Sequence, residues 1–121
     1  MSLNRAIPIH VHSAVEVIAA PMLLAAPFVF GFSAGAGAVS IALAIVLTGL
    51  AVSVYGEAER GALPLQAHAG FDYVIAAITI ALGIAVGFAA GDFAAGIFMV
   101  GFGSAHLALT ASTRYSRPLG A

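Results

Sequence analysis

Four long apolar stretches dominate this chain of 121 residues and leave it few ways to fold. They run from Ser13 to Phe32, from Ala38 to Val54, from Pro64 to Ala89 and from Phe93 to Ala111. A helix needs about 20 predominantly apolar residues to cross a bilayer, and each stretch is close to that length. Charged residues make up 7% of the chain, whereas a soluble domain has roughly 25%. We therefore predict an all-α protein, a four-transmembrane-helix bundle forming one integral membrane domain over residues 1–121, with the lipid bilayer as its partner.

The linkers between these stretches are short, then longer, then short. Residues 33–37, rich in glycine and alanine, predict a tight turn. Residues 90–92 predict a second one, in which Asp92 suits the N-cap of the last helix. Residues 57–66, with Glu57, Glu59 and Arg60, form the one sizeable loop, and Gly56 suits a helix C-cap before it. This spacing predicts two helical hairpins.

Both halves of the chain open with the same pattern: a proline, a histidine four residues later and a carboxylate four residues after that. The pattern recurs at an offset of 56 residues, as Pro8, His12 and Glu16 and then as Pro64, His68 and Asp72. Each predicted hairpin tip also carries Gly-Phe-x-x-Gly, at residues 31–35 and 87–91. We predict two tandem hairpin repeats, over about residues 8–56 and 64–112. Their pseudo-two-fold axis is expected to lie along the membrane normal.

The arginines predict the orientation of the chain in the membrane. All four lie on the side that holds both termini and the middle loop: Arg5, Arg60, Arg114 and Arg117. Short cytoplasmic loops carry an excess of Lys and Arg, so we expect both termini on the cytoplasmic side of the cell inner membrane. Arg114 and Arg117 are expected to anchor to lipid headgroups.

Small residues at four-residue spacing indicate close helix packing. Examples are Gly83, Gly87 and Gly91, and the last stretch adds Gly96, Gly101, Gly103 and Ser104. Such residues let helix backbones approach closely in lipid. They serve a tight bundle, and they also permit a homo-oligomer or a role as a scaffold or accessory subunit within a larger membrane complex.

Residues 26–33, Ala-Pro-Phe-Val-Phe-Gly-Phe-Ser, resemble the repeat motif of the SPW-repeat proteins. That family consists of small prokaryotic membrane proteins built from tandem two-helix repeats, each with Ser-Pro-Trp near the end of its first helix. The resemblance covers about residues 12–110. Here Ala26 and Phe28 replace the Ser and Trp, and the second half has Leu82-Gly83-Ile84 with no proline. The resemblance implies a duplicated four-helix membrane fold and no known reaction.

Five polar side chains enter the cytoplasmic ends of the predicted helices: His12, Glu16, His68, Asp72 and His106. Residues four apart share a helix face, so His12 lies over Glu16, and His68 over Asp72. The last helix returns toward the same side and brings His106 to a similar depth. Burying a carboxylate in lipid is costly unless it is paired, so we expect His12 to pair with Asp72 and His68 with Glu16 across the axis, or each pair to form within its helix. His10, just outside, is expected to be interfacial.

Three functions suit these side chains. All five can bind a transition-metal ion such as Zn, Fe, Mn or Cu, since imidazole and carboxylate are its ligands, although the spacing matches no known zinc or di-iron motif. Alternatively, His12 and His68, with His106 nearby, can hold a haem-like cofactor between helices. A third alternative is a proton relay or a small ion-coupled transporter, because histidine titrates near neutrality.

A purely structural interpretation also stands: these side chains reach interfacial water or cap neighbouring elements. The chain has no cysteine, which excludes thiolate and iron–sulfur sites. No motif for covalent catalysis accompanies Ser13, so we assign no catalytic residue and lean against an enzyme. A net charge of −1 gives no sign of nucleic-acid binding. The leading hypothesis is a metal- or cofactor-binding membrane protein, and its rival is the scaffold.

Overall fold

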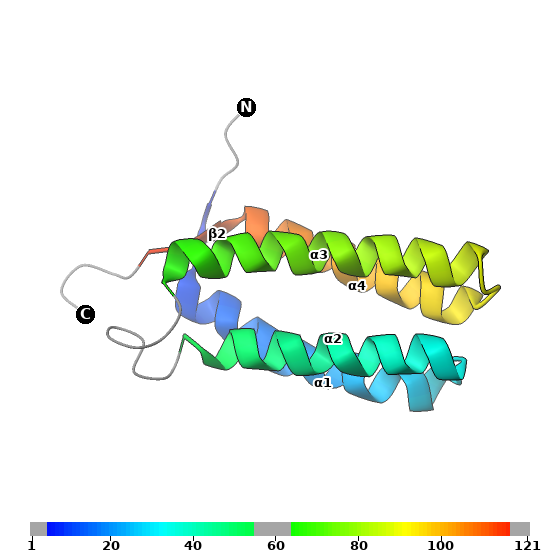
Figure 1. The fold of residues 1–121 in the computed structure, drawn as a ribbon. Coiled ribbons are helices and arrows are strands. Elements are labelled where there is room, and N and C mark those ends of the chain that lie inside the picture. Colours follow the sequence, from blue (N-terminus) through cyan, green and yellow to red (C-terminus); the bar gives the residue numbers. More distant parts are fainter. Residues whose placement is uncertain (1–4, 55–63, 117–121) are drawn as a thin grey trace.

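A computed structural model describes residues 5–54 and 64–116, and four helices account for most of them. They are α1 (Ile9–Phe30), α2 (Ala34–Val52), α3 (Leu65–Phe88) and α4 (Phe93–Ala111). Each is long and apolar enough to cross a membrane. Helices α1 and α2 pack side by side, as do α3 and α4 (Figure 1). The predicted bundle of two helical hairpins is confirmed.

The repeated opening pattern occupies equivalent places in the two hairpins. Helix α1 begins directly after Pro8 and α3 directly after Pro64, and each proline is the N-cap residue in extended conformation. A proline suits the start of a helix because its missing N–H would have no partner there. The histidine and the carboxylate therefore fall at the same positions of α1 and α3.

The first hairpin tip is shorter than predicted. The turn spans residues 31–33, where Gly31 adopts the left-handed conformation at φ 66°. Residues 34–37, expected in the turn, already belong to α2 because the Ser33 side chain caps that helix by accepting from the N–H of Ala36. In the second tip Gly91, not Gly87, has positive φ. The two Gly-Phe-x-x-Gly patterns are therefore not structurally equivalent.

The capping residues show which positions of α2 and α4, the second helices of the two hairpins, correspond to each other. Asp92 caps α4 through Ala95 as predicted, just as Ser33 caps α2 through Ala36. The two caps are 59 residues apart, whereas α1 and α3 begin 56 residues apart. Asp92 also accepts a 2.7 Å hydrogen bond from the N–H of Ser33, which joins the two tips. These backbone donors hold the pKa of the Asp92 carboxyl below its usual value.

Large hydrophobic side chains point outward, while polar side chains are buried. Ile18 is 71% exposed, Phe28 77% and Phe88 84%. Soluble proteins rarely expose contiguous apolar surface on this scale, so the outer faces are those of a bundle surrounded by lipid. An apolar core of six buried residues holds the middle of the bundle together: Ala20, Leu23, Leu43, Ala44, Leu47 and Met99.

Glycines bring α3 and α4 into close contact, as predicted from their spacing. A Cβ at Gly96 would lie 2.9 Å from Gly87 Cα, and one at Gly103 would lie 3.0 Å from the carbonyl oxygen of Ala76. At both positions the backbone of α3 is close enough that a side chain on α4 would collide with it, and at Gly103 the Ile80 side chain adds to the contact. Gly101, on the same helix, has open space around it.

Two short strands tie the described ends of the chain together. Strand β1 (Ile7–Pro8) pairs in parallel with β2 (Thr113–Arg114), and Ile7 donates a 3.0 Å hydrogen bond to Ser112. Both strands lie outside the four apolar stretches, and their pairing was not predicted from the sequence. The predictions for Gly56, Glu57, Glu59, Arg60 and Arg117 fall outside the described residues.

Candidate functional site

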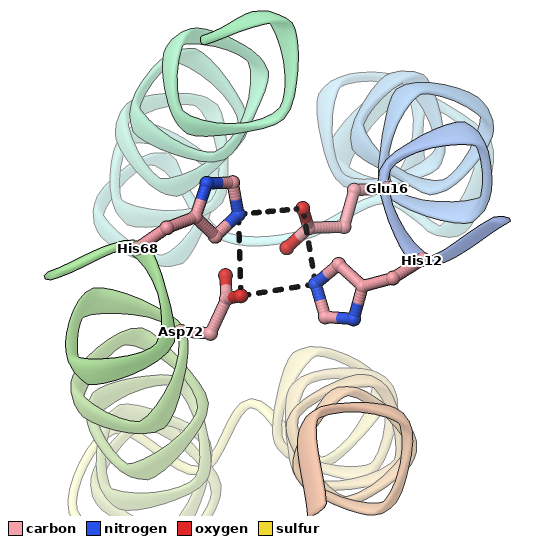
Figure 2. A group of neighbouring side chains, drawn as sticks. All are labelled: His12, Glu16, His68 and Asp72. Carbon is pink, nitrogen blue, oxygen red and sulfur yellow. Dashed lines mark hydrogen bonds and ion pairs between the residues drawn. The ribbon is translucent and has the colours of Figure 1, made fainter. Parts of the chain in front are cut away.

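Two histidines and two carboxylates from different hairpins meet inside the bundle, near the end that carries β1 and β2. His12 and Glu16 come from α1, and His68 and Asp72 come from α3. Their polar atoms point toward one another and form a four-sided ring (Figure 2). None of the four side chains is more than 1% exposed.

The ring has four similar sides, each joining an imidazole nitrogen to a carboxylate oxygen. His12 Nε2 lies 3.3 Å from Glu16 Oε1 and 2.9 Å from Asp72 Oδ2. His68 Nε2 lies 3.4 Å from the same Glu16 oxygen and 3.3 Å from the same Asp72 oxygen. The structure thus contains the pairs expected across the axis and also those expected within each helix.

His106 reaches the other oxygen of each carboxylate. Its Nε2 lies 2.9 Å from Glu16 Oε2 and 3.4 Å from Asp72 Oδ1. Helix α4 brings this side chain to the same depth, as the sequence analysis expected. All five predicted residues therefore meet, with four in the ring and His106 behind the carboxylates. His10 is exposed and lies on the outer surface of α1.

A threonine fixes which nitrogen of His12 carries a proton. The Thr113 hydroxyl donates to the carbonyl oxygen of Leu109 at 2.6 Å, so its oxygen is left to accept. His12 Nδ1 lies 2.8 Å from that oxygen and is therefore the N–H donor. In the neutral imidazole, Nε2 then carries only a lone pair, and this lone pair faces the ring.

A serine gives His68 the same tautomer. The Ser53 hydroxyl donates to the carbonyl oxygen of Leu50 at 2.6 Å, and its oxygen lies 3.4 Å from His68 Nδ1. The supporting hydroxyl of each histidine comes from the other repeat. Thr113 follows α4 and supports His12 on α1, while Ser53 follows α2 and supports His68 on α3. Partners of this kind on the second ring nitrogen are typical of histidines that bind metal.

With both imidazoles neutral, the ring would bring acceptor atoms together with no proton between them. An ionised carboxylate has only acceptors, and each neutral imidazole presents a lone pair. Acceptors at 2.9–3.4 Å repel one another unless a cation lies among them. Positive charge at the centre of the ring, on protons or on a metal ion, is therefore a requirement of this geometry.

Tyr115 closes the ring on its outer side. Its hydroxyl donates a 2.7 Å hydrogen bond to Asp72 Oδ2, the oxygen that faces both ring histidines. Burial, together with this bond to Asp72, raises the pKa of the Tyr115 hydroxyl above its usual value. Tyr115 therefore stays a hydrogen-bond donor and fixes the orientation of the carboxylate.

The sequence analysis missed the three supporting hydroxyls, Ser53, Thr113 and Tyr115. All three lie just beyond the end of a helix, at the depth of the ring, so a search for hydroxyl residues flanking the helix ends would have found them. Thr113 and Tyr115 are directed inward only because β2 pairs with β1, and that pairing joins residues more than 100 positions apart.

An apolar cavity of about 220 Å³ borders the ring between α1 and α4. Glu16 and His106 line its inner end, and Leu47 of α2 lines it as well. Leu47 lies 14 residues after its capping residue Ser33, and His106 lies 14 after Asp92. Leu47 is therefore the counterpart of His106, which explains why only one further histidine, from α4, contacts the ring in the described part of the chain.

Comparison of the chain with known protein families, with curated proteins and with solved structures found no match.

Proposed function

We propose that this protein binds one divalent transition-metal ion inside the membrane, with His12, Glu16, His68 and Asp72 as its ligands. One observation carries the proposal: the Nε2 atoms of two histidines, whose Nδ1 atoms each contact a hydroxyl group, converge with two carboxylate oxygens on a common centre. All four ligand atoms lie within 4.8 Å of one another.

The charges favour a divalent ion. Two ionised carboxylates carry two negative charges, and charge that is not neutralised is costly in a bilayer. A divalent cation bound by two carboxylates and two neutral imidazoles makes the centre neutral. It also replaces the repulsion between facing acceptors with four metal–ligand bonds.

The four sides of the ring are short enough for one first-row ion to bind all four ligand atoms. Ligands about 2.0–2.1 Å from a tetrahedral zinc ion lie about 3.3–3.4 Å from each other. Three sides of the ring measure 3.3–3.4 Å, and the fourth measures 2.9 Å. Imidazole and carboxylate ligands suit zinc, iron and manganese. His106 contacts the outer oxygen of each carboxylate and so orients both from behind.

A haem-like cofactor is less well supported. The imidazole rings of His12 and His68 have centroids 5.9 Å apart, and the Glu16 and Asp72 carboxylates contact both. A flat macrocycle held between the two nitrogens would have to displace those carboxylates. The ring therefore favours a single ion over a tetrapyrrole.

Proton or ion transport across the bilayer is also less well supported. Beyond the ring, toward the tips, the Ser40 and Thr79 hydroxyls donate to backbone carbonyls of their own hairpins. Leu23, Leu47 and Met99 fill the axis there, each at most 1% exposed. The described residues thus place a polar layer at one end of the bundle and offer no polar route through it.

The metal centre is proposed to face the cytoplasm. Arg5 and Arg114, the two described arginines, lie at the end of the bundle that carries the centre. Positive residues favour the cytoplasmic side of a membrane, which supports the inner-membrane orientation predicted from the sequence. The scaffold role is the alternative if no ion binds, since the exposed apolar faces suit packing against other membrane proteins equally well.

The proposal is tested by titrating the purified protein, after treatment with a chelator, with Zn²⁺. We expect one ion per chain. Asp72→Asn keeps the shape of a ligand but removes its charge. Because loss of a supporting residue alone typically weakens metal affinity 10–100-fold, losing this ligand is expected to weaken it about 100-fold or more. Asp92→Asn is the matched control, because it removes a carboxylate at the opposite end and is expected to leave affinity unchanged.

Equal Zn²⁺ affinity in the wild type and Asp72→Asn would contradict the proposal, and so would binding that Asp92→Asn weakens to the same extent. Retained helical circular dichroism in each variant ensures that lost binding reports on the site and not on unfolding.

A further inference from the structure

A second cavity lies outside the ring, at the membrane interface. Its volume is about 380 Å³, and it is formed by the start of α3, the end of α4 and the segments around β1 and β2. The residues that matter in its lining are Arg5, Gln66, Tyr73, Arg114, Tyr115 and Ser116. We call it the Arg5/Arg114 pocket.

The strand pairing brings the two arginines to one cavity. Pro8 pairs with Arg114 and Ile7 with Thr113, so the segment that contains Arg5 runs alongside the end of the chain that contains Arg114. Two arginines more than 100 residues apart in sequence therefore line the same cavity.

This pocket is positively charged and holds no compensating acid. No carboxylate is among its lining residues in the described part of the chain, and neither arginine makes a salt bridge with a described residue. Both arginines are exposed, so an anion from solution or from the lipid surface can reach them. Two cations in one partly enclosed cavity repel each other, and an anion between them relieves that repulsion.

The donors around the cavity suit a phosphate group. Each guanidinium presents a planar fork of N–H donors that matches two phosphate oxygens. The Gln66 amide and the hydroxyls of Tyr73 and Ser116 add neutral donors around the same space. A cavity of this volume is larger than one phosphate needs, which leaves room for the organic part of a phosphate ester.

We infer that the Arg5/Arg114 pocket binds a phosphate group, of an anionic lipid headgroup or of a soluble phosphate ester. This site goes beyond the proposed metal centre and does not require it, since none of the four ring residues lines the pocket. The two sites share one wall, Tyr115, which lines the pocket and donates to Asp72. A bound phosphate would therefore lie next to the residue that orients a metal ligand.

Two arms of one experiment distinguish the two sources of phosphate. In the first, chelator-treated protein in detergent is titrated with inorganic phosphate by calorimetry. In the second, it is placed in nanodiscs of phosphatidylcholine with or without phosphatidylglycerol, and the lipid it retains is measured by native mass spectrometry. The variants are Arg5→Gln and Arg114→Gln. Arg114→Lys keeps the charge without the fork, and Asp92→Asn is the control.

We expect at least a tenfold loss of binding in each Arg→Gln variant, an intermediate loss in Arg114→Lys, and none in Asp92→Asn. Binding in the lipid arm alone identifies a headgroup site, and binding in the phosphate arm identifies a site for soluble esters. If both Arg→Gln variants match the wild type in both arms, or the wild type binds in neither, the inference is wrong. Using metal-free protein keeps this result separate from the metal proposal.

Discussion

At the scale of single residues, the chemistry of the ring depends on hydroxyl groups outside it. Thr113 and Ser53 each give their proton to a backbone carbonyl and accept from an imidazole. This arrangement directs the lone pairs of His12 and His68 toward the carboxylates. Without these supports either nitrogen of each imidazole could carry the proton, and the lone pairs would no longer be fixed in the direction of a bound cation.

Replacing Thr113 by Val should therefore weaken Zn²⁺ binding, by about 10–100-fold for the loss of a supporting hydrogen bond. The substitution keeps the branched shape and removes only the hydroxyl, which accepts from His12 and donates to the carbonyl oxygen of Leu109. Competition with a fluorescent zinc chelator measures the change. Thr113→Ser, which retains the hydroxyl, should bind within a few-fold of the wild type, and a loss in Thr113→Ser equal to that in Thr113→Val would mean that packing and not the hydroxyl matters.

Asp92 makes the stability of the hairpin tips depend on pH. Its pKa is lowered because the N–H groups of Ser33 and Ala95 donate to the carboxylate. Such a group stabilises the fold at pH values above its unfolded pKa of about 3.9, and this contribution is lost as pH falls through the lowered folded value. Asp92→Asn should therefore lose less stability than the wild type on acidification, as measured by unfolding in detergent across the acid range. Parallel pH profiles for the two proteins would show that the tip contact contributes nothing.

At the scale of helices, the features that depend on length and on helical periodicity could be predicted from the sequence. The start of α3 after Pro64 and the full extent of α4 agree with the structure, and spacing by four put each histidine over its carboxylate. The first tip could not be placed correctly, because glycine, alanine and serine suit a turn and a membrane helix alike. The turn is placed by Gly31, which ends α1 in the left-handed conformation, and by Ser33, which accepts from the N–H groups of Ala36 and Gly37 at the start of α2.

The residues that support the ring could not be predicted from the sequence, for a different reason. Thr113 and Tyr115 follow the last helix, where no periodic pattern applies, and their direction is set by strand pairing with the opposite end of the chain. Likewise the matching of Leu47 with His106 follows from an offset of 59 residues, which becomes visible only once both caps are known.

The contact between α3 and α4 offers a direct test of helix packing. Gly96→Ala adds a methyl group 2.9 Å from Gly87 Cα, and because backbone cannot move aside as a side chain can, we expect a loss of about 1–3 kcal/mol in unfolding free energy. Gly101→Ala, where nothing lies within 4 Å, should cost nothing. Reversible unfolding in mixed micelles compares them. Equal stability of the two variants would mean that this contact is looser than described.

At the scale of the whole molecule, the duplication makes the site. Each repeat supplies one histidine, one carboxylate and one supporting hydroxyl of its own, and each hydroxyl supports the histidine of the other repeat. Neither hairpin alone has the four ligands. The symmetry is broken where α4 carries His106 and α2 carries Leu47, and both residues line the apolar cavity beside the ring.

X-ray absorption spectroscopy of the zinc-loaded protein tests the central claim most directly, because it reports the ligands of the bound ion. The account predicts a shell of about four nitrogen and oxygen ligands at about 2.0–2.1 Å, with scattering from two imidazoles that falls to one in His12→Ala or His68→Ala. A spectrum of hydrated zinc without imidazole scattering, or protein that retains no zinc, would contradict it.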